Sequence, residues 1–399
     1  MTAPDARSVP FGTLALTLAI QSLVSLVVYA MGVLIPLAYQ DAGAAATAIG
    51  VFTALAYGMS AFSAPIGGGF VARHGGLRVS QVCLLAAGFG GALCAVPYAW
   101  AGVLGALLIG VGYGPSTPAS AALLAERTPE RIRNLIMSIR QTGVPVGGAL
   151  AGAIVPTLAL TVGWQAATLI IGAVCIVAAV AMQPLRATYD AGARAASAAP
   201  RPGLRDFLAV TFSHPRLAEL ALASFGYAGV QICLSMFMVA YLHEQIGYSV
   251  VAAGAVLATA MTAGIIGRVC WGLIADLAGN PRRVLGVLGA VMAVSTGLLG
   301  VVTDGWPYGV VLALGAVFGA SAIGWNGVFI AEISRHAPPG KVALATGASL
   351  MFTYTGVVVV PLTFSLLVAV SGYRPAYAML AVVTALAAGL FFRRARLGA

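Results

Sequence analysis

Residues 11–39 have the sequence FGTLALTLAIQSLVSLVVYAMGVLIPLAY, in which no side chain carries a charge. A helix needs about 20 consecutive apolar residues to cross a bilayer, so this stretch is long enough to do so. It is also far longer than the apolar region of a cleavable signal peptide, which has roughly 7–15 residues. We therefore expect a first membrane span and not a removable leader.

The remainder of the chain repeats this pattern. Of the 399 residues, 60% are hydrophobic and only 8% are charged, whereas soluble proteins carry about 25% charged residues. Further apolar runs of spanning length lie at 45–72, 77–97, 100–125, 133–161, 164–185, 217–242, 249–275, 283–302, 307–333, 343–370 and 373–392. The sequence thus predicts an all-α membrane protein with twelve transmembrane helices in two six-helix halves, residues 1–186 and 216–399. A flexible cytoplasmic linker is expected at 187–215, with an amphipathic stretch at 204–217.

The basic side chains predict the orientation of these spans. Almost all of the 21 Lys and Arg residues fall into alternate loops, the linker and the termini, and Arg374 is the one in the opposite loops. Cytoplasmic loops carry the excess of basic residues, so both termini are predicted to be cytoplasmic, in a bacterial-type inner membrane. Basic residues that lie between apolar runs orient the spans in the membrane. We therefore expect the lipid bilayer, and not nucleic acid, as the partner of these charges. We also expect a monomer.

The two halves resemble each other in sequence. Corresponding glycines keep a nearly constant offset: Gly69 with Gly272, Gly76 with Gly279, Gly110 with Gly315, and Gly114 with Gly319. Parallel internal repeats are typical of transporters whose halves move about a central site.

One loop carries a family resemblance that covers essentially the whole chain. Residues 272–283, GLIADLAGNPRR, resemble the signature Gly-x-x-x-Asp-Arg-x-Gly-Arg-Lys/Arg of the major facilitator superfamily, and residues 69–78, GFVARHGGLR, are a degraded copy with Arg73 in place of the acid. The resemblance implies the major facilitator fold. It also implies conformational gating at these loops, for which the candidates are Gly272, Asp276, Gly279, Arg282, Arg283, Arg73 and Arg78. Three further gating candidates follow from the residues themselves: Glu126 and Glu332 as partners of an arginine, and Pro145 as the proline that loosens span five.

Two shorter motifs bear on the substrate. Residues 267–272, GRVCWG, resemble oxalate/formate antiporters and monocarboxylate transporters, in which this arginine binds a substrate carboxylate. The monocarboxylate branch has an Asp one turn earlier, where this chain has Gly264, so proton coupling through such a pair is not expected. Residues 143–148, GVPVGG, partly resemble the drug/proton antiporter branch, although its Gly-Pro dipeptide is broken.

Two arginines are the deep charges of the predicted spans. All 11 acidic residues lie at span ends or in loops, while Arg140 and Arg268 lie inside spans. A charge in mid-span costs at least ~2.5 kcal/mol and persists where it meets a partner, for which a bound anion is suited to the guanidinium fork. The alternatives are that the arginines snorkel to the membrane boundary or pair with Glu126 or Glu332 as a gate.

Polar side chains near the predicted midplane complete the candidate site. An amide or hydroxyl in hydrocarbon needs a partner, which either a substrate cavity or a neighbouring helix can supply. The family's path is lined by spans one, four, seven and ten. The polar candidates on those spans are Tyr29, Tyr113, Tyr227, Gln231, Trp325 and Asn326, and Tyr354 on the eleventh span is a further candidate.

The sequence therefore favours a secondary active transporter of a small organic anion, with a carboxylate first, working by alternating access as an antiporter or symporter. A proton-coupled drug efflux antiporter is the alternative, suggested by the glycines of span five. No Walker motif and no metal-ligand spacing is present, so no enzyme activity, cofactor or metal is expected.

Overall fold

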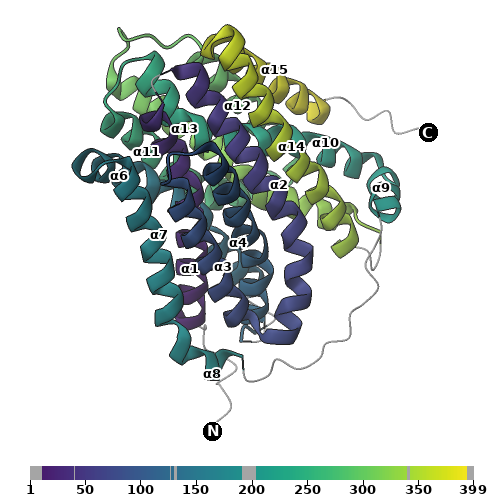
Figure 1. The fold of residues 1–399 in the computed structure, drawn as a ribbon. Helices are drawn as coiled ribbons and strands as arrows, with labels where there is room; N and C mark the ends of the chain where they lie inside the picture. The colour runs from purple at the N-terminus through teal and green to yellow at the C-terminus, as the bar shows by residue number, and fades with distance from the viewer. Residues whose placement is uncertain are drawn as a thin grey trace. The chain divides into compact units, whose positions relative to one another are not determined.

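The computed structural model describes residues 11–39, 41–125, 127–129, 133–190, 204–338 and 342–392. Within these ranges it contains 12 helices that are long and apolar enough to cross a membrane, and no strand (Figure 1). The predicted all-α fold with twelve spans is confirmed. By contacts the chain divides into two compact units. Unit 1 comprises Met1–Leu34 and Leu55–Ala199, and unit 2 comprises Ile35–Ala54 and Pro200–Ala399.

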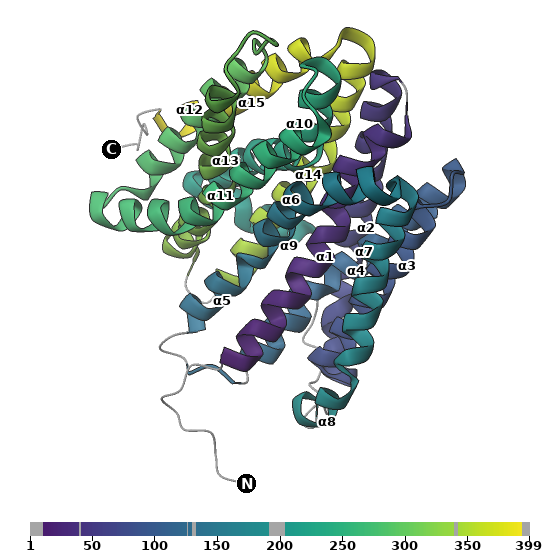
Figure 2. The ribbon, with the colours of Figure 1, turned by 90° about the vertical axis from the view of Figure 1, so that its left-hand side faces the viewer.

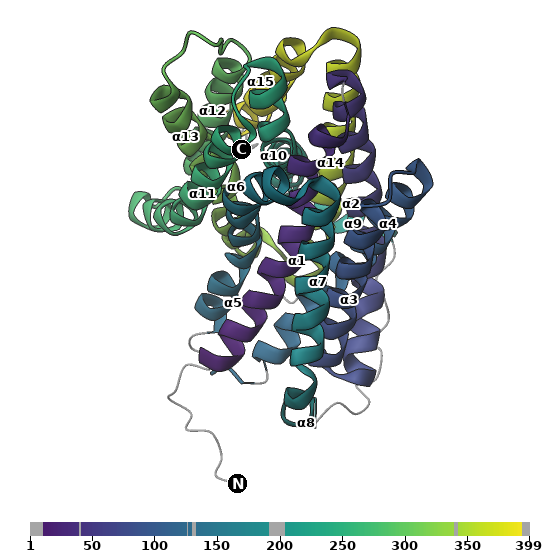
Figure 3. The same cartoon turned by 60° about the vertical axis from the view of Figure 1, so that its left-hand side comes forward.

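The helices of the first half follow one another with short connections. They are α1 (Phe11–Ala38), α2 (Ala42–His74), α3 (Gly76–Cys94), α4 (Ala99–Ala125), α5 (Arg133–Gln141), α6 (Gly143–Val162) and α7 (Trp164–Ala181), with the short η2 (Gln183–Leu185) and α8 (Arg186–Tyr189) after them. In unit 1, α3 packs beside α7 (Figure 3). A Cβ on Gly172 would lie 2.6 Å from the carbonyl oxygen of Gly88, so only glycine permits this spacing.

The predicted apolar run at 133–161 comprises α5 and α6, and the candidate span Ile139–Val162 takes in the last residues of α5 and all of α6. The chain breaks at Thr142, between α5 and α6 (Figure 2). Pro145 has no N–H to donate to the carbonyl of Gln141, which ends the helical ladder at that point. Gly143 lets the backbone approach α1, because a Cβ there would lie 2.9 Å from Cβ of Gln21. The break therefore places the end of α5 against α1.

The second half contains α9 (Leu204–Phe212), α10 (Pro215–Ala240), the π-helical turn η3 (Tyr241–Gln245), α11 (Val250–Ala278), α12 (Pro281–Leu299), α13 (Tyr308–His336), α14 (Val342–Ser371) and α15 (Tyr373–Phe392). In unit 2, α11 packs closely on α13. A Cβ on Gly319 would lie 1.9 Å from the carbonyl oxygen of Ala260, and one on Gly267 would lie 2.5 Å from that of Ala320. Small residues thus bring together the two helices that carry Arg268 and Trp325.

The segment after the sixth span is more ordered than a flexible linker from residue 187 would be. Residues 186–189 form α8, and Asp190 hydrogen-bonds to the start of α3 within unit 1. The helix α9 covers most of the predicted amphipathic stretch. Residues 191–203 lie outside the described ranges.

Candidate functional site

Arg140 lies at the centre of a polar cluster in unit 1. Its side chain is only 2% exposed. Nη2 donates to Oε1 of Gln21 at 2.7 Å and to the carbonyl oxygen of Ser116 at 3.2 Å. Nη1 donates to Oε1 of Gln141 at 2.8 Å. We call these four residues the Arg140 cluster. Among the residues that the structure describes, no carboxylate pairs with this guanidinium.

Two of the three partners of Arg140, Gln21 and Ser116, come from other helices, α1 and α4, and lie well inside them. Gln21 is about 15 Å along α1 from Phe11, and Ser116 is about 14 Å from the Ala125 end of α4, at a rise of about 1.5 Å per residue. Oε1 of Gln21 also accepts from the Ser116 hydroxyl at 3.2 Å, and Nε2 of Gln21 donates to Ser25 at 3.2 Å. This network orients the Gln21 oxygen towards the guanidinium. The contacts of Arg140 with Gln21 and Ser116 therefore lie about 14–15 Å inside the ends of α1 and α4.

Two buried polar atoms in this region have no hydrogen-bond partner in the described part of the chain: Nε of Arg140 and the hydroxyl of Tyr57. Both can donate a hydrogen bond. The Tyr57 ring packs edge-on against Tyr113, with ring centroids 5.4 Å apart. Tyr29 is also buried, in α1. Tyr57, Gln21 and Gln141 are not among the substrate residues predicted from the sequence, where their only signal is an amide or hydroxyl in a predicted span.

Unit 2 contains a second polar cluster, formed by Gln231, Trp325 and Asn326. Oε1 of Gln231 accepts from Nε1 of Trp325 at 3.1 Å and from Nδ2 of Asn326 at 3.2 Å. Nδ2 of Asn326 also lies 3.3 Å from the carbonyl oxygen of Ile323. The Trp325 side chain is buried, while Gln231 and Asn326 are half-buried. Three of the predicted substrate residues are thus brought together, and we call them the Gln231 cluster.

Arg268 lies on α11 against α13. Its Nε donates to the carbonyl oxygen of Ile323 at 3.1 Å, and the side chain is half-buried. The neighbouring Trp271 donates from Nε1 to the carbonyl oxygen of Ala320 at 3.1 Å. Asn326 and Arg268 therefore share one acceptor, so the arginine lies beside the Gln231 cluster.

Two predicted substrate residues have different surroundings. The Tyr227 hydroxyl donates to the carbonyl oxygen of Leu285 on α12 at 2.8 Å, and its ring packs on Trp325 and Phe391. This buried position supports helix packing, with one edge of the ring reaching the Gln231 cluster. Tyr354 is half-buried on α14.

The gating candidates of the second half lie at the α11–α12 connection. Gly279 ends α11 in the left-handed conformation, at φ 61°, and Asn280 caps α12 by accepting from the Arg283 amide at 3.1 Å. Arg282 pairs with Glu219 of α10 at 3.1 Å and donates to the carbonyl oxygen of Leu390 on α15 at 2.9 Å. Asp276 is exposed on the last turn of α11, and Gly272 has no neighbour within 4 Å of where its Cβ would lie. Arg282 therefore connects three helices of unit 2.

The corresponding connection in the first half uses an acid that the sequence motif lacks. Arg73 is exposed at the end of α2. Oδ1 of Asp190 accepts from the Leu77 amide and Oδ2 accepts from the Arg78 amide, each at 2.9 Å. Gly75 has φ +90°, and a Cβ there would lie 2.2 Å from Oδ1 of Asp190. The carboxylate at the start of α3 thus comes from the segment after α8.

The remaining gating candidates are scattered. Glu332 is 7% exposed near the end of α13, with Oε1 3.6 Å from Nδ1 of His336 and Oε2 3.8 Å from Nη1 of Arg335. Pro145 is buried in the first turn of α6, next to the helix break. Glu126 lies outside the described residues.

Residues 17–347 match the Major Facilitator Superfamily. An uncharacterized MFS-type transporter of Mycobacterium tuberculosis (strain CDC 1551 / Oshkosh) is 28% identical over 289 residues, which are 71% of this chain and 62% of that protein. A transporter with the same description from strain ATCC 25618 / H37Rv is 27% identical over the same shares. The match thus spans less than two thirds of the length of these curated relatives.

Solved transporters share the fold. A POT family transporter in complex with 5-aminolevulinic acid has a TM-score of 0.75 at 12% identity, over 96% of this chain and 95% of that chain. A bacterial homolog to the human lysosomal transporter Spinster has a TM-score of 0.75 at 15% identity, over 98% and 97%. A D-xylose-proton symporter has a TM-score of 0.72 at 17% identity, over 96% of both chains. Since the family match covers most of the sequence and the twelve-helix fold agrees with it, the chain belongs to the major facilitator superfamily.

Proposed function

We propose that this protein is a secondary active transporter of a small organic anion, with a carboxylate as the first candidate, that works by alternating access in a bacterial-type inner membrane. The observation that carries the proposal is the Arg140 cluster. Its guanidinium is buried inside unit 1, and its hydrogen bonds to the described residues go to neutral oxygens. Neutral acceptors satisfy N–H groups, but they leave the positive charge uncompensated.

An unpartnered donor on this guanidinium favours the same class of ligand. Nε of Arg140 is buried, can donate a hydrogen bond and has no partner among the described residues. A carboxylate brings a negative charge and two acceptor oxygens, and it suits the planar fork of an arginine. A cationic drug would instead meet a like charge here. The Arg140 cluster therefore favours anion transport over the drug antiporter alternative.

Unit 2 carries a second group of candidate substrate contacts. Arg268 and the Gln231 cluster carry one guanidinium, two amides and an indole N–H within one group of helices. The likeness of residues 267–272 to oxalate/formate antiporters and monocarboxylate transporters supports a carboxylate contact by Arg268. We assign anion binding first to Arg140, because its side chain is buried whereas that of Arg268 is half-buried. Exchange of anions, or movement of a proton with the substrate, would provide the coupling.

The test is uptake into proteoliposomes that contain the purified full-length protein. Labelled monocarboxylates, dicarboxylates and phosphate would be compared with a neutral sugar and a cationic dye, each with unlabelled counter-substrate inside. We expect uptake of one anion class alone. Arg140→Gln should abolish it, and Arg268→Gln should weaken or abolish it. The same anion should raise the Tm of the wild type but not that of Arg140→Gln.

Arg374→Gln is the matched control, because it removes one positive charge at an exposed position outside both clusters. It should transport normally. Size-exclusion profiles and circular dichroism would show that each variant is folded. Transport of the neutral or cationic probe, or unchanged anion uptake by Arg140→Gln, would overturn the proposal.

A further inference from the structure

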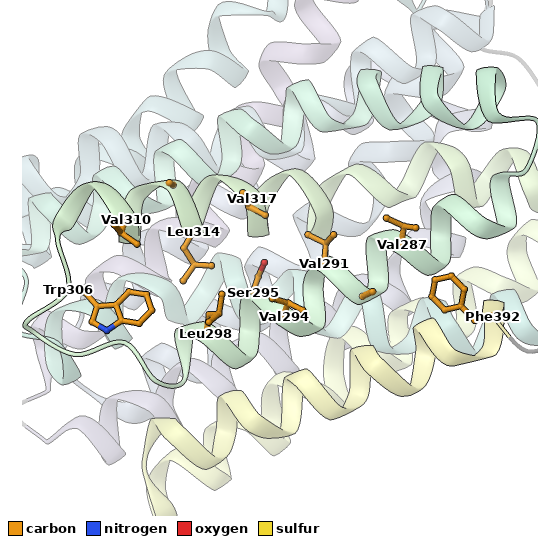
Figure 4. Close-up of a pocket in the computed structure, with 12 residues that line it drawn as sticks. Val287, Val291, Val294, Ser295, Leu298, Trp306, Val310, Leu314, Val317 and Phe392 are labelled. Atoms are coloured by element: carbon orange, nitrogen blue, oxygen red, sulfur yellow. The ribbon is translucent and has the colours of Figure 1, made fainter.

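A groove lies between α12 and α13 in unit 2 (Figure 4). Its volume is about 610 Å³, within the roughly 300–1,000 Å³ of ordinary ligand sites. Valines and leucines of the two helices form the walls, Trp306 lies at one end and Phe392 at the other. Apart from the Trp306 indole, Ser295 is the one polar side chain in its lining. The body of any occupant is therefore apolar.

The groove opens on the face of unit 2 that carries exposed apolar side chains. Val294 on α12 is 62% exposed, and Val310 and Val317 on α13 are also exposed. Such side chains on membrane-spanning helices contact lipid hydrocarbon. From Val287 to Leu298 the groove follows α12 for about 16 Å, at about 1.5 Å per residue. One leaflet contributes about half of a hydrocarbon core of ~30 Å, so the length suits one acyl chain.

A free positive charge stands at one mouth of this groove. Arg283 precedes Val287 by four residues and so lies on the same face of α12, one turn beyond the Phe392 end. Its side chain is exposed, and in the described part of the chain it makes no hydrogen bond or ion pair. The adjacent Arg282 differs, since it is held by Glu219. The mouth therefore offers one guanidinium to a negatively charged group.

We propose that the groove binds an anionic glycerophospholipid, with one acyl chain between α12 and α13 and the phosphate on Arg283. The acyl chain then contacts the apolar wall of the groove, and the phosphate of the head group contacts the guanidinium of Arg283. The distribution of basic residues predicts that the Arg283 end is cytoplasmic, and the cytoplasmic leaflet is where anionic lipids gather. The site is separate from both polar clusters and does not depend on the transported substrate.

Native mass spectrometry of the full-length protein in detergent tests this proposal. Phosphatidylglycerol and phosphatidylcholine with the same acyl chains would be titrated separately. We expect about fivefold tighter binding of phosphatidylglycerol, the equivalent of ~1 kcal/mol for one arginine near a charged head group. Arg283→Gln should remove this preference while phosphatidylcholine binding stays. Val294→Trp should fill the groove and weaken the binding of both lipids.

Two variants serve as matched controls. Arg78 is the third residue of α3, as Arg283 is of α12, so Arg78→Gln makes the same charge change at the start of the equivalent helix. Val269→Trp adds an indole at an exposed valine of α11, outside the groove. Both should bind lipids like the wild type. Equal binding of the two lipids by the wild type, or a preference that survives Arg283→Gln, would overturn the proposal. Undiminished lipid binding by Val294→Trp would also overturn the proposal. So would a wild-type dimer that Val294→Trp separates into monomers, because the groove would then bind a second copy of the chain.

Discussion

Removing the carboxylate of Asp190 should open the first turn of α3. The amides of Leu77 and Arg78 belong to that first turn and have no intrahelical acceptor. Each donates to one oxygen of Asp190 at 2.9 Å. We expect Asp190→Ala to cost about 2 kcal/mol locally, as an N-cap that accepts two charge-assisted hydrogen bonds. Asp190→Asn keeps one acceptor oxygen and should cost about half as much.

Hydrogen–deuterium exchange measures this loss directly at the amides of Leu77 and Arg78. A loss of 2 kcal/mol corresponds to about a 30-fold faster exchange of the Leu77 and Arg78 amides, and a loss of 1 kcal/mol to about fivefold. The start of α12 is an internal reference, because Asn280 caps it and should keep its exchange rate in both variants. Asp304→Asn, in an exposed loop, is the external control. Wild-type exchange at Leu77 and Arg78 in Asp190→Ala would refute the assignment of Asp190 as their cap.

Three further changes probe packing, charge and the second cluster. Gly172→Ala places a methyl group 2.6 Å from a carbonyl oxygen of α3 and should destabilise by about 1–3 kcal/mol, measured as a lower Tm, whereas Gly102→Ala has open space and should not; equal Tm values for the two would contradict the close approach. Glu219→Gln weakens the pair with Arg282 and should lower the Tm by a smaller amount that shrinks further in high salt, because the pair is partly exposed; a salt-independent loss would argue against an ionic role. Trp325→Phe removes the N–H that binds an amide oxygen but keeps a ring, so we expect a KM several-fold higher with little change in Tm, and an unchanged KM would leave the indole without a part in binding.

The positions of the spans could be predicted from the sequence, because a run of about 20 apolar residues is stable in a bilayer and not in water. It also identified Arg140 and Arg268 as the charges inside spans. The partners of Arg140 were less accessible to sequence reasoning, since Gln21 and Ser116 are far away in the chain and meet it only through helix packing. The break at Thr142 follows from Pro145 and Gly143 together, yet a proline in a membrane helix can also be accommodated without a break.

The first-half connection shows a different limit. Arg73 suggested that this half lacks the acid of its signature loop. The structure supplies a carboxylate from Asp190, more than a hundred residues later, in a segment whose Ala, Arg and Pro content predicted a linker. Composition describes the average of a segment, whereas one side chain with two acceptor oxygens decides where that segment docks.

The neutral hydrogen-bond partners of Arg140 determine which step of the proposed transport cycle moves net charge across the membrane. The empty Arg140 cluster carries one positive charge that no described carboxylate compensates, and a bound monovalent carboxylate cancels it. Moving one elementary charge through the membrane potential is worth about 2.3 kcal/mol per 100 mV. The return of the empty site is therefore sensitive to voltage, while the loaded step is not. A potential that is negative inside holds the empty site towards the cytoplasm, so one-for-one exchange is the electrically silent mode and net movement of a monoanion is electrogenic.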